Sequence, residues 1–589
     1  MIGQKPQLSG TEEKTLRAIV IHFAEEPFTC EALEAAAPWE LTGWEAEAGV
    51  AGLRRRGIVT TRKKAWGERI HTLADGVFVY WQQLFVGGGE SLAIPAGRIV
   101  PSYEPRRGIA SLLFGLLSAA RYTLLPLTQK GTLHKRDLQR LSERLDVSDE
   151  ELAGLQNSYL HQDKYGIAFA VVYDMALRLG LLTGGVDRIA ANPKRLEEWL
   201  GRSRREMNER LLAIWREVYM PSDVWLQHAA ALLQSLPAGQ WTSVSRMTEL
   251  LLSAGVPQGG RTQAELEDAI RACWLRPMRA FGWLELGNLH GEEDAVRWKQ
   301  DPDGAEEAGT WYVQPDFEVL VPPGVPFSLR WGLEACCQYA GGEELEKYRL
   351  TKESLTRALD LGMSAEDVTE LLRRGSKHGV PSNVEETVRG WGSRYGTVTM
   401  ENVTLLRCRD SKDAEDIRSH PMTAPYVITL VGDRDLIVRS GMADELFDVL
   451  KRQGYDPRKE EGEVPPPSAE EGKSPESPGG LVYSRRTAAL FPVDPAPPAP
   501  ESVRLAEQVP QAWIKQLRRY HLSTMRDLVE TAVRLRTNVK LGRDGELKTF
   551  YPRRMERMND RWFAVGYMDG AEARIAIEEW AEAQLLLPE

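Results

Sequence analysis

The stretch LRRRGIVTT, Leu53 to Thr61, decides how the first part of the chain folds. Its arginines are typical of the last turn of a helix, its glycine suits the left-handed residue that ends many helices, and its apolar residues begin a strand. The same order recurs in ALRLGLLTG, Ala176 to Gly184, and in MRAFGWLEL, Met278 to Leu286. Each stretch therefore predicts a helix, a glycine and a strand in immediate succession.

The first stretch has the fullest surroundings. Helices are expected from about Glu12 to Phe23, from Thr29 to Ala36 and from Gly43 to Arg56, followed by a hairpin in IVTTRKKAWGERIHTL. Three helices and a hairpin in this order are typical of a winged helix. Around the other two stretches the expected helices are longer and the hairpin patterns are weaker. Winged-helix-like modules and a plain helical bundle therefore both stay open there.

Composition bounds the class of protein. A length of 589 residues predicts about three to five domains. The formal charge of -11 argues against a surface that coats nucleic acid indiscriminately, so any DNA contact must be localised. The longest apolar run, GIASLLFGLLSAA from Gly108, is shorter than the roughly 20 residues that cross a bilayer, and predicts a buried helix. An N-terminus without a secretory signal and five cysteines without a C-x-x-C pair favour the cytoplasm, with no membrane contact.

A second informative stretch is TWYVQPDFEVLVPP, Thr310 to Pro323. Apolar residues at every second position predict a strand, and Pro315 in mid-run predicts an edge strand or a bulge. Three well-marked helix starts follow, at Thr351, Ser364 and Ser382. Ser382 and Glu385 match a capping box, in which each satisfies an amide of the helix start. With a hairpin around Glu401-Asn402 and a helix in MADELFDVLKRQGY, a small α+β domain is expected.

This succession carries a family resemblance. The stretches WYVQPDFEVLVPP, YRLTKESLTRALDLGMSAEDVTELLRRGS, VPSNVEETVRGWGSRYGTVTM and LFDVLKRQGY, within residues 310–455, resemble the N-terminal domain of XPB-type DNA repair helicases, also found in bacterial helicase-associated proteins. In that family the domain is likened to a damage-sensing fold and precedes the helicase motor in the same chain. The resemblance implies a role beside such a helicase, as a sensor or a docking platform.

The sequence lacks the phosphate-binding loop that a motor needs. Its only G-K-S, Gly472 to Ser474, has Pro467 where the first glycine of the loop belongs, and it lies in a stretch with neither a strand before it nor a helix after it. The nine histidines form no helical metal pair, although a metal site built from distant residues stays open. We therefore expect no enzyme, no cofactor and a helicase partner in trans.

In the last part of the chain the sequence pattern changes twice. Between Gly454 and Ser502 a Pro-, Glu- and Ser-rich composition predicts a disordered linker. Beyond a helix at Met525 to Arg536, turn signals predict a β meander or small barrel; they are Asp544-Gly545, Asn559-Asp560 and Asp569-Gly570. This part faintly resembles the WYL domains of bacterial regulators, at Pro552, Arg561-Trp562-Phe563-Ala564, Tyr567 and Arg574-Ile575-Ala576-Ile577.

Two departures from the WYL pattern put a ligand role in doubt. Phe563-Ala564 replaces the Tyr-Leu that names that family, and Glu579 stands near the place of a late arginine. The alternative is an SH3-like or other small barrel in which Trp562 and Phe563 are core residues.

The expected fold is thus multidomain, mainly α with α+β parts. Six segments are expected: a winged-helix-like domain at 1–90, a helical or winged-helix-like domain at 91–215, a winged-helix-like domain at 216–308, the XPB N-terminal-like α+β domain at 309–455, the linker at 456–503, and the WYL-like or SH3-like β domain at 504–589.

Two basic clusters are the candidate DNA-binding residues. The first spans the end of the expected recognition helix and its wing, and consists of Arg54, Arg55, Arg56, Arg62, Lys63 and Lys64. The second follows a helix of the XPB-like domain and consists of Arg373, Arg374 and Lys377. In the first cluster, positive charges could meet phosphates on both sides of a groove. The alternative for both clusters is a solvated helix end, where the helix dipole favours arginine.

Two functions of different class follow. The first is a non-enzymatic helicase-associated protein that binds an XPB-type repair helicase, DNA or both. The second is a transcription regulator with an N-terminal winged helix and a WYL-like effector domain. A nuclease or another enzyme with a long-range site has no local motif in its favour.

Overall fold

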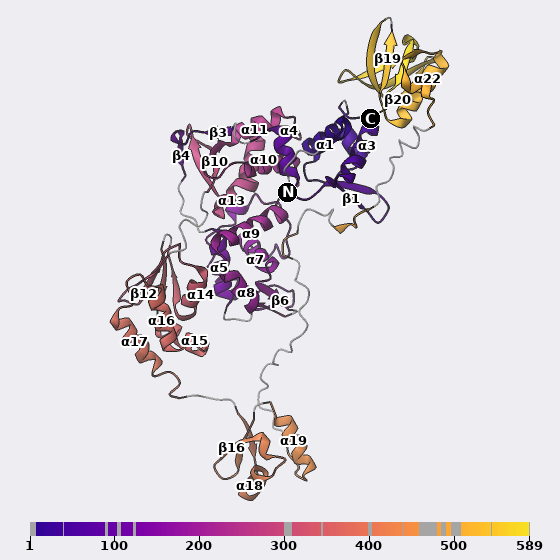
Figure 1. Ribbon diagram of the computed structural model, residues 1–589. Helices are drawn as coiled ribbons and strands as arrows, with labels where there is room; N and C mark the ends of the chain where they lie inside the picture. The colour runs from indigo at the N-terminus through magenta and orange to yellow at the C-terminus, as the bar shows by residue number, and fades with distance from the viewer. Residues whose placement is uncertain are drawn as a thin grey trace.

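The described residues fold into several small sheets with helices around them, so the chain is mixed α and β (Figure 1). The computed structural model describes residues 7–38, 40–88, 92–102, 108–121, 125–185, 187–299, 309–342, 345–398, 403–439, 441–458, 480–483, 490–495, 508–543 and 545–587.

The three helix–glycine–strand stretches fold as the sequence predicts. Gly57, Gly180 and Gly282 have φ angles of 71°, 67° and 76°, in the left-handed region. The residue after each glycine donates its amide, at 3.0 Å, to the carbonyl five residues earlier. This is the Schellman arrangement, which satisfies carbonyls that a helix end leaves without partners. A strand follows each glycine within two residues.

Three units share one element order, which is a helix, a short strand, two helices and a hairpin. The first unit consists of α1 (Gly10–Phe23), the single residue Phe28, α2 (Cys30–Ala36), α3 (Gly43–Arg55), β1 (Val59–Lys63) and β2 (Arg69–Leu73). The second unit consists of α5 (Ile109–Ala120), β5 (Leu125–Pro126), α6 (Lys135–Ser142), α7 (Ile167–Arg178), β6 (Leu182–Gly184) and β7 (Arg188–Ala191).

The third unit has the same order with a longer last helix. It consists of α10 (Val224–Gln234), β8 (Trp241–Ser243), α11 (Val244–Ser253), α12 (Gln263–Ile270), which continues through a π-helical turn into α13 (Arg276–Ala280), β9 (Leu284–Leu289) and β10 (Glu292–Trp298). In all three units the short strand pairs with the last strand of the hairpin, as Phe28 with β2, β5 with β7 and β8 with β10.

The remaining elements of this region join the units together. Two short strands extend the third unit's sheet, in the order β3-β8-β10-β9-β4. The joining elements are α4 (Phe78–Val86), β3 (Ala93–Ile94), β4 (Ile99–Pro101), α8 (Pro193–Leu200) and α9 (Arg204–Val218). The long apolar run forms α5, which is buried in the largest hydrophobic cluster, as expected. Every described helix is too short or too polar to cross a membrane.

The stretch TWYVQPDFEVLVPP forms two strands, so the prediction of one strand is wrong. β11 (Tyr312–Val313) and β12 (Glu318–Val321) pair antiparallel, and Pro315 lies in the turn between them. Phe317 ends that turn with a φ of 70°. The turn signal Pro-Asp decides the local structure here. β11 is nevertheless an edge strand, in the sheet order β11-β12-β14-β13.

The helices after this hairpin correct a second prediction. Thr351 and Ser364 cap α15 and α16 as expected, but α17 begins at Ser382 itself, so its cap position falls on Pro381 and no side chain caps it. Glu385 instead accepts a hydrogen bond from Arg373 at 2.7 Å. The elements of this part are α14 (Phe327–Cys336), β13 (Gln338–Gly341), β14 (Glu346–Arg349), α15 (Lys352–Asp360), α16 (Ala365–Gly375) and α17 (Ser382–Gly392).

The segment 403–455 has its own small core. Residues 311–391 build one hydrophobic cluster and residues 406–455 another, where one domain core was expected. The expected hairpin is also wrong, because β15 pairs with β17 and residues 395–398 form no strand, while Glu401-Asn402 lies outside the described residues. The elements are β15 (Thr404–Arg407), α18 (Ser411–Ser419), β16 (Val427–Val431), β17 (Asp435–Val438) and α19 (Ala443–Arg452).

The expected disordered linker contains two docked pieces. Residues 480–483, here called the anchor, lie against the second unit, and Val482 is 1% exposed in its core. Asp174 accepts from the Val482 amide at 2.8 Å. Residues 490–495, here called the strap, lie along β1 of the first unit. The prediction of disorder is therefore wrong for these residues; 459–479, 484–489 and 496–503 lie outside the described residues.

The C-terminal part is a six-stranded sheet with a helix against it (Figure 1). Its strand order is β18-β23-β19-β20-β21-β22, so β19 to β22 form the predicted meander. Asn559, Asp560, Asp569 and Gly570 all have positive φ, as the predicted tight turns require, while Asp544 lies outside the described residues. The elements are α21 (Gln511–Lys515), β18 (Arg518–Arg519), α22 (Leu522–Leu535), β19 (Val539–Arg543), β20 (Glu546–Met558), β21 (Arg561–Met568), β22 (Ala571–Ala576) and β23 (Glu582–Leu585).

Candidate nucleic-acid interface

The first basic cluster lies where α3 passes into the β1–β2 hairpin. Arg55 and Lys63 are exposed, and their side chains make no hydrogen bond or ion pair with the described residues. Lys64, further along the hairpin, pairs with Glu68 at 3.1 Å. This part of the cluster is available to an anion from solvent.

Arg56 has a structural partner. Its guanidinium donates to the Glu12 carboxylate on α1, with two contacts of 3.0 Å. Burial alone would raise the pKa of Glu12, but hydrogen bonds from Arg56 and from the Ser9 amide hold that pKa below its ordinary value. Glu12 also accepts as the third residue of the α1 capping box. Arg56 therefore fixes α3 to the start of α1.

The strap covers two further arginines. Its backbone pairs antiparallel with β1, because the Lys63 amide donates to the Pro492 carbonyl at 3.1 Å and the Asp494 amide donates to Thr61 at 2.9 Å. Arg62 donates to the Phe491 carbonyl at 2.8 Å. Arg54 donates to the Asp494 carbonyl at 2.9 Å. The hairpin thus carries the strap as a third strand.

Two residues of this hairpin were not among the sequence candidates. Arg69 lies on β2 and its Nε is 2.9 Å from the Asp494 carboxylate. Trp66, in the turn between β1 and β2, is 71% exposed, and its ring lies 5.3 Å from the Lys64 ammonium. A large exposed aromatic side chain beside lysines is a typical base-stacking element. The signal in the sequence was a tryptophan next to Gly67, in a turn.

The other end of α3 is covered by the C-terminal sheet. Trp44 packs into the core cluster of that sheet, and its amide donates to the Arg536 carbonyl at 3.0 Å. The Gly43 amide donates to the Tyr551 hydroxyl at 3.1 Å. In helix-turn-helix proteins the N-terminal residues of the recognition helix contact the bases. On α3 these residues are buried inside the chain.

A buried carboxylate fixes that contact. Glu34 of α2 is 3% exposed and pairs with both Arg536 and Arg553. The Tyr551 hydroxyl donates to the same carboxylate at 2.5 Å. Burial raises the pKa of Tyr551, so its hydroxyl keeps its proton. Charge pairing and hydrogen bonding together hold the first unit on the C-terminal sheet.

The second basic cluster lies at the end of α16. Arg373 is paired with Glu370 and Glu385, at 3.0 and 2.7 Å. Arg374 and Lys377 are exposed, and the Lys377 ammonium lies 5.8 Å from the Tyr312 ring. The structure does not bring the two clusters together, because α16 and β1 belong to separate units that lie apart in Figure 1.

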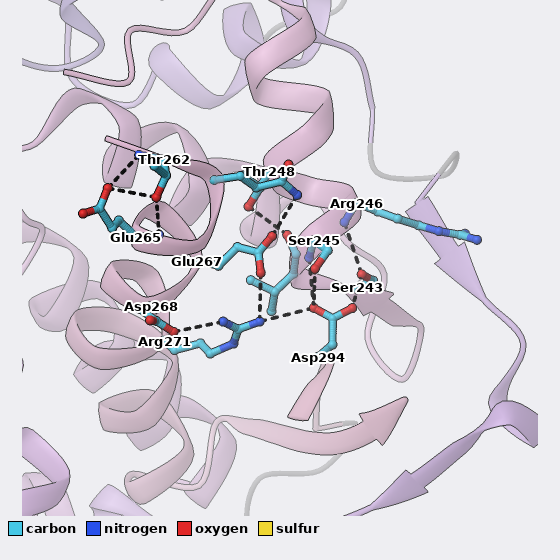
Figure 2. A network of polar contacts seen from close by, with 12 residues as sticks. Ser243, Ser245, Arg246, Thr248, Thr262, Glu265, Glu267, Asp268, Arg271 and Asp294 are labelled. Carbon is cyan, nitrogen blue, oxygen red and sulfur yellow. Dashed lines mark hydrogen bonds and ion pairs between the residues drawn. The ribbon is translucent and has the colours of Figure 1, made fainter. Parts of the chain in front are cut away.

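Acidic groups elsewhere have structural partners. Figure 2 shows Asp294 of β10 facing the first turn of α11, where it accepts from the Ser245 amide at 3.0 Å. Arg271 lies between Asp294 and Glu267 and pairs with both. This network joins the third unit's hairpin to its helices. Among the described residues, no group of three His, Cys, Asp or Glu side chains is placed to hold a metal ion.

Residues 311–431 match the family model described as helicase conserved C-terminal domain. The match begins at Trp311 and spans the sheet β11-β12-β14-β13, the helices α14 to α18 and the strands β15 and β16. It points to a helicase-related protein. A search of curated proteins finds no match to the chain.

Proposed function

We propose that this protein is a non-enzymatic, helicase-associated DNA-binding protein that works beside an XPB-type repair helicase. The match of residues 311–431 to a helicase domain carries this proposal. In the proposal, that domain is a docking or sensing platform of the XPB type. The three units are winged helices, and DNA is bound by the wing of the first unit.

Three features support the DNA contact. The shared element order, with the short strand paired to the last strand of the hairpin, is the order of winged helices. Arg55 at the end of α3 and Lys63 on β1 are exposed. Trp66 at the tip offers an apolar surface on which an unpaired base of a DNA fork could stack. Such a surface suits an acidic protein, because the positive charge is local.

A charge-matched pair of variants tests the DNA contact. The double variant R55Q/K63Q removes one exposed charge from the end of α3 and one from β1, and R205Q/K194Q removes two exposed charges from α8 and α9. We expect R55Q/K63Q to weaken binding of a forked duplex and to reduce the salt slope by about 2, because each phosphate contact contributes about 0.9. The control should bind as the wild type does. Equal binding by both double variants would contradict the proposed surface.

The partnership is tested separately. Co-purification with an XPB-type helicase, and stimulation of its ATPase by this protein on forked DNA, are the expected results. If the two proteins do not associate and the ATPase is not stimulated, the partnership proposal is refuted, whatever the DNA affinity. Exposed residues of the matched domain such as Arg374 and Lys377 provide the variants for mapping the contact.

One observation favours a second function, that of a transcription regulator with a WYL-like effector domain. The C-terminal sheet lies directly on the start of α3, so a ligand bound there could be sensed by the helix. A footprint on one specific duplex, altered by a ligand of the C-terminal domain, would favour the regulator. Structure-selective binding to forks without sequence preference would favour the helicase-associated function.

A further inference from the structure

The strap lies on the same hairpin that the proposed function assigns to DNA. We propose that the strap is a built-in competitor for DNA, which must leave β1 before phosphates can reach the arginines beneath it. This inference rests on the proposed DNA-binding function and adds its regulation. It also adds Arg69 to the binding surface.

The contacts of the strap resemble those of a bound anion. Asp494 places its carboxylate 2.9 Å from Arg69 and its carbonyl 2.9 Å from Arg54. Phe491 presents its carbonyl to Arg62. Three arginines thus donate to oxygens of one extended segment. A phosphate backbone presents oxygens to arginine in the same way, with stronger, charge-assisted hydrogen bonds.

The strap is held by little buried surface. Val493 is 53% exposed and Leu490 is 81% exposed. Its ion pair is solvated on one side, with the Arg69 side chain 45% exposed and the Asp494 side chain 11% exposed, and a partly exposed pair contributes on the order of 1 kcal/mol. The main-chain bonds to Thr61 and Lys63 can be exchanged for bonds to water. Displacement by a polyanion therefore costs little.

The anchor behaves differently. Leu481 and Val482 are 6% and 1% exposed within the core of the second unit. The Val482 amide is bonded to Asp174, and its carbonyl accepts from Arg178. Val482 and Val493 are eleven positions apart in the sequence, so a displaced strap stays tethered nearby. A short tether keeps its effective concentration in the millimolar range. Binding of DNA is thereby made reversible and dependent on salt.

A cross-strand disulfide tests the competition within one variant. Arg62 and Val493 are paired across the two strands, and the flanking bonds place them at a non-hydrogen-bonded pair. Their Cα atoms are then about 4.5 Å apart, within the range of disulfides. In R62C/V493C the strap is locked when oxidised and free when reduced, with unchanged charge. The wild type and the single variant V493C, treated in the same way, control for oxidation of the native cysteines.

Affinity for a forked duplex is the readout. We expect the reduced form to bind about tenfold more tightly than the oxidised form. Its salt slope should be steeper by about 2, because Arg54 and Arg69 become available to phosphates. The control proteins should bind equally under both conditions. Hydrogen exchange of residues 490–495 should rise when DNA is added to the reduced form.

A charge variant supports the test without cysteines. D494N removes the carboxylate that faces Arg69, and D433N removes one exposed carboxylate from the turn between β16 and β17. We expect D494N to tighten DNA binding threefold or more and D433N to leave it unchanged.

The outcomes separate the two proposals. Equal affinity in the locked and free forms, with the strap still protected when DNA is bound, would overturn the competition and leave DNA binding intact. Binding of a protein segment to the free β1 edge in place of DNA would also overturn it. Failure of every form to bind forked DNA would refute the DNA-binding function itself.

Discussion

Replacement of Glu34 by glutamine tests how the first unit is held on the C-terminal sheet. The carboxylate is buried and accepts from Arg536, Arg553 and the Tyr551 hydroxyl. In E34Q one of its oxygens becomes an NH₂ group that faces donors. Removing one partner of a buried ion pair costs about 3–5 kcal/mol. Arg536 keeps Glu47 at 3.2 Å and the Arg553 side chain is 42% exposed to water, so neither charge is left buried without a partner and the lower value applies.

The matched control is E31Q on the same helix. Glu31 also faces Arg536, but at 3.9 Å and with a side chain that is 75% exposed. An exposed pair of this kind contributes about 0–1 kcal/mol. Both variants remove one negative charge from α2 beside Arg536, and they differ in how deeply that charge is buried.

Hydrogen exchange of the Trp44 amide is the assay, because this amide donates to the Arg536 carbonyl across the contact. Its exchange reports local opening. About 3 kcal/mol corresponds to exchange about a hundredfold faster, and we expect this in E34Q and less than fivefold in E31Q. If E34Q and E31Q exchange at similar rates, burial of Glu34 does not hold the contact and the reasoning is refuted.

Three further predictions concern the hairpin, its pH dependence and the helix caps. W66A should leave stability unchanged within about 0.5 kcal/mol and weaken fork binding about fivefold or more, since a stacked base contributes about 1–3 kcal/mol; L547A, at a residue 50% exposed in the C-terminal sheet, is the control and should change neither. Burial lowers the pKa of His71 to about 4, with a further contribution from Arg54. The unfolded chain therefore binds a proton first as pH falls from 6.5 to 4, and stability should drop through this window by up to about 1.4 kcal/mol per pH unit; urea midpoints against pH should show a shallower fall in H71Q, and an unchanged slope would contradict the assignment. S364A should destabilise its domain by about 1 kcal/mol because Ser364 caps α16, whereas S382A should cost almost nothing because Ser382 caps no amide; thermal unfolding of both variants decides, and equal losses would restore the capping box at Ser382.

The sequence predicted structure wherever the deciding interactions are local. The three helix ends at Gly57, Gly180 and Gly282 need only a glycine and five neighbouring residues, so their pattern could be recognised. The tight turns at Asn559-Asp560 and Asp569-Gly570 have the same local origin. Thr351 and Ser364 were recognised as caps for that reason as well.

The strand prediction failed for a geometric reason. In the hairpin Tyr312 pairs with Leu320 and Val313 with Val319, so paired residues differ by an even number of positions. Paired residues of antiparallel strands point to the same face. The period-two pattern is therefore identical for one straight strand and for this folded hairpin. Pro315 and Asp316 were the only local sign of the turn.

The candidate interface could be predicted only in part, because its partners lie far away in the sequence. Arg62 bonds to a residue 429 positions away, and Arg54 to one 440 positions away. The Pro-, Glu- and Ser-rich composition of the linker gives no sign of the two short pieces that dock on surfaces already formed. The charge pattern predicted where the basic cluster lies, whereas the strap that covers part of it is positioned by tertiary structure.

The two covers on the first unit differ in strength, and this difference bears on the choice between the proposed functions. Release of α3 from the C-terminal sheet exposes Trp44, which is buried in that sheet's core cluster, and breaks the pairing of Glu34 with Arg536. A ligand can shift such an equilibrium only by its difference in affinity for the two states. Release of the strap breaks main-chain bonds and an ion pair whose Arg69 side chain is 45% exposed and whose Asp494 side chain is 11% exposed, while Leu490 and Val493 are already exposed. DNA binding through the hairpin needs only the strap to leave, whereas the regulator needs the C-terminal sheet to release α3. Release of the strap costs less free energy, and this favours the helicase-associated function.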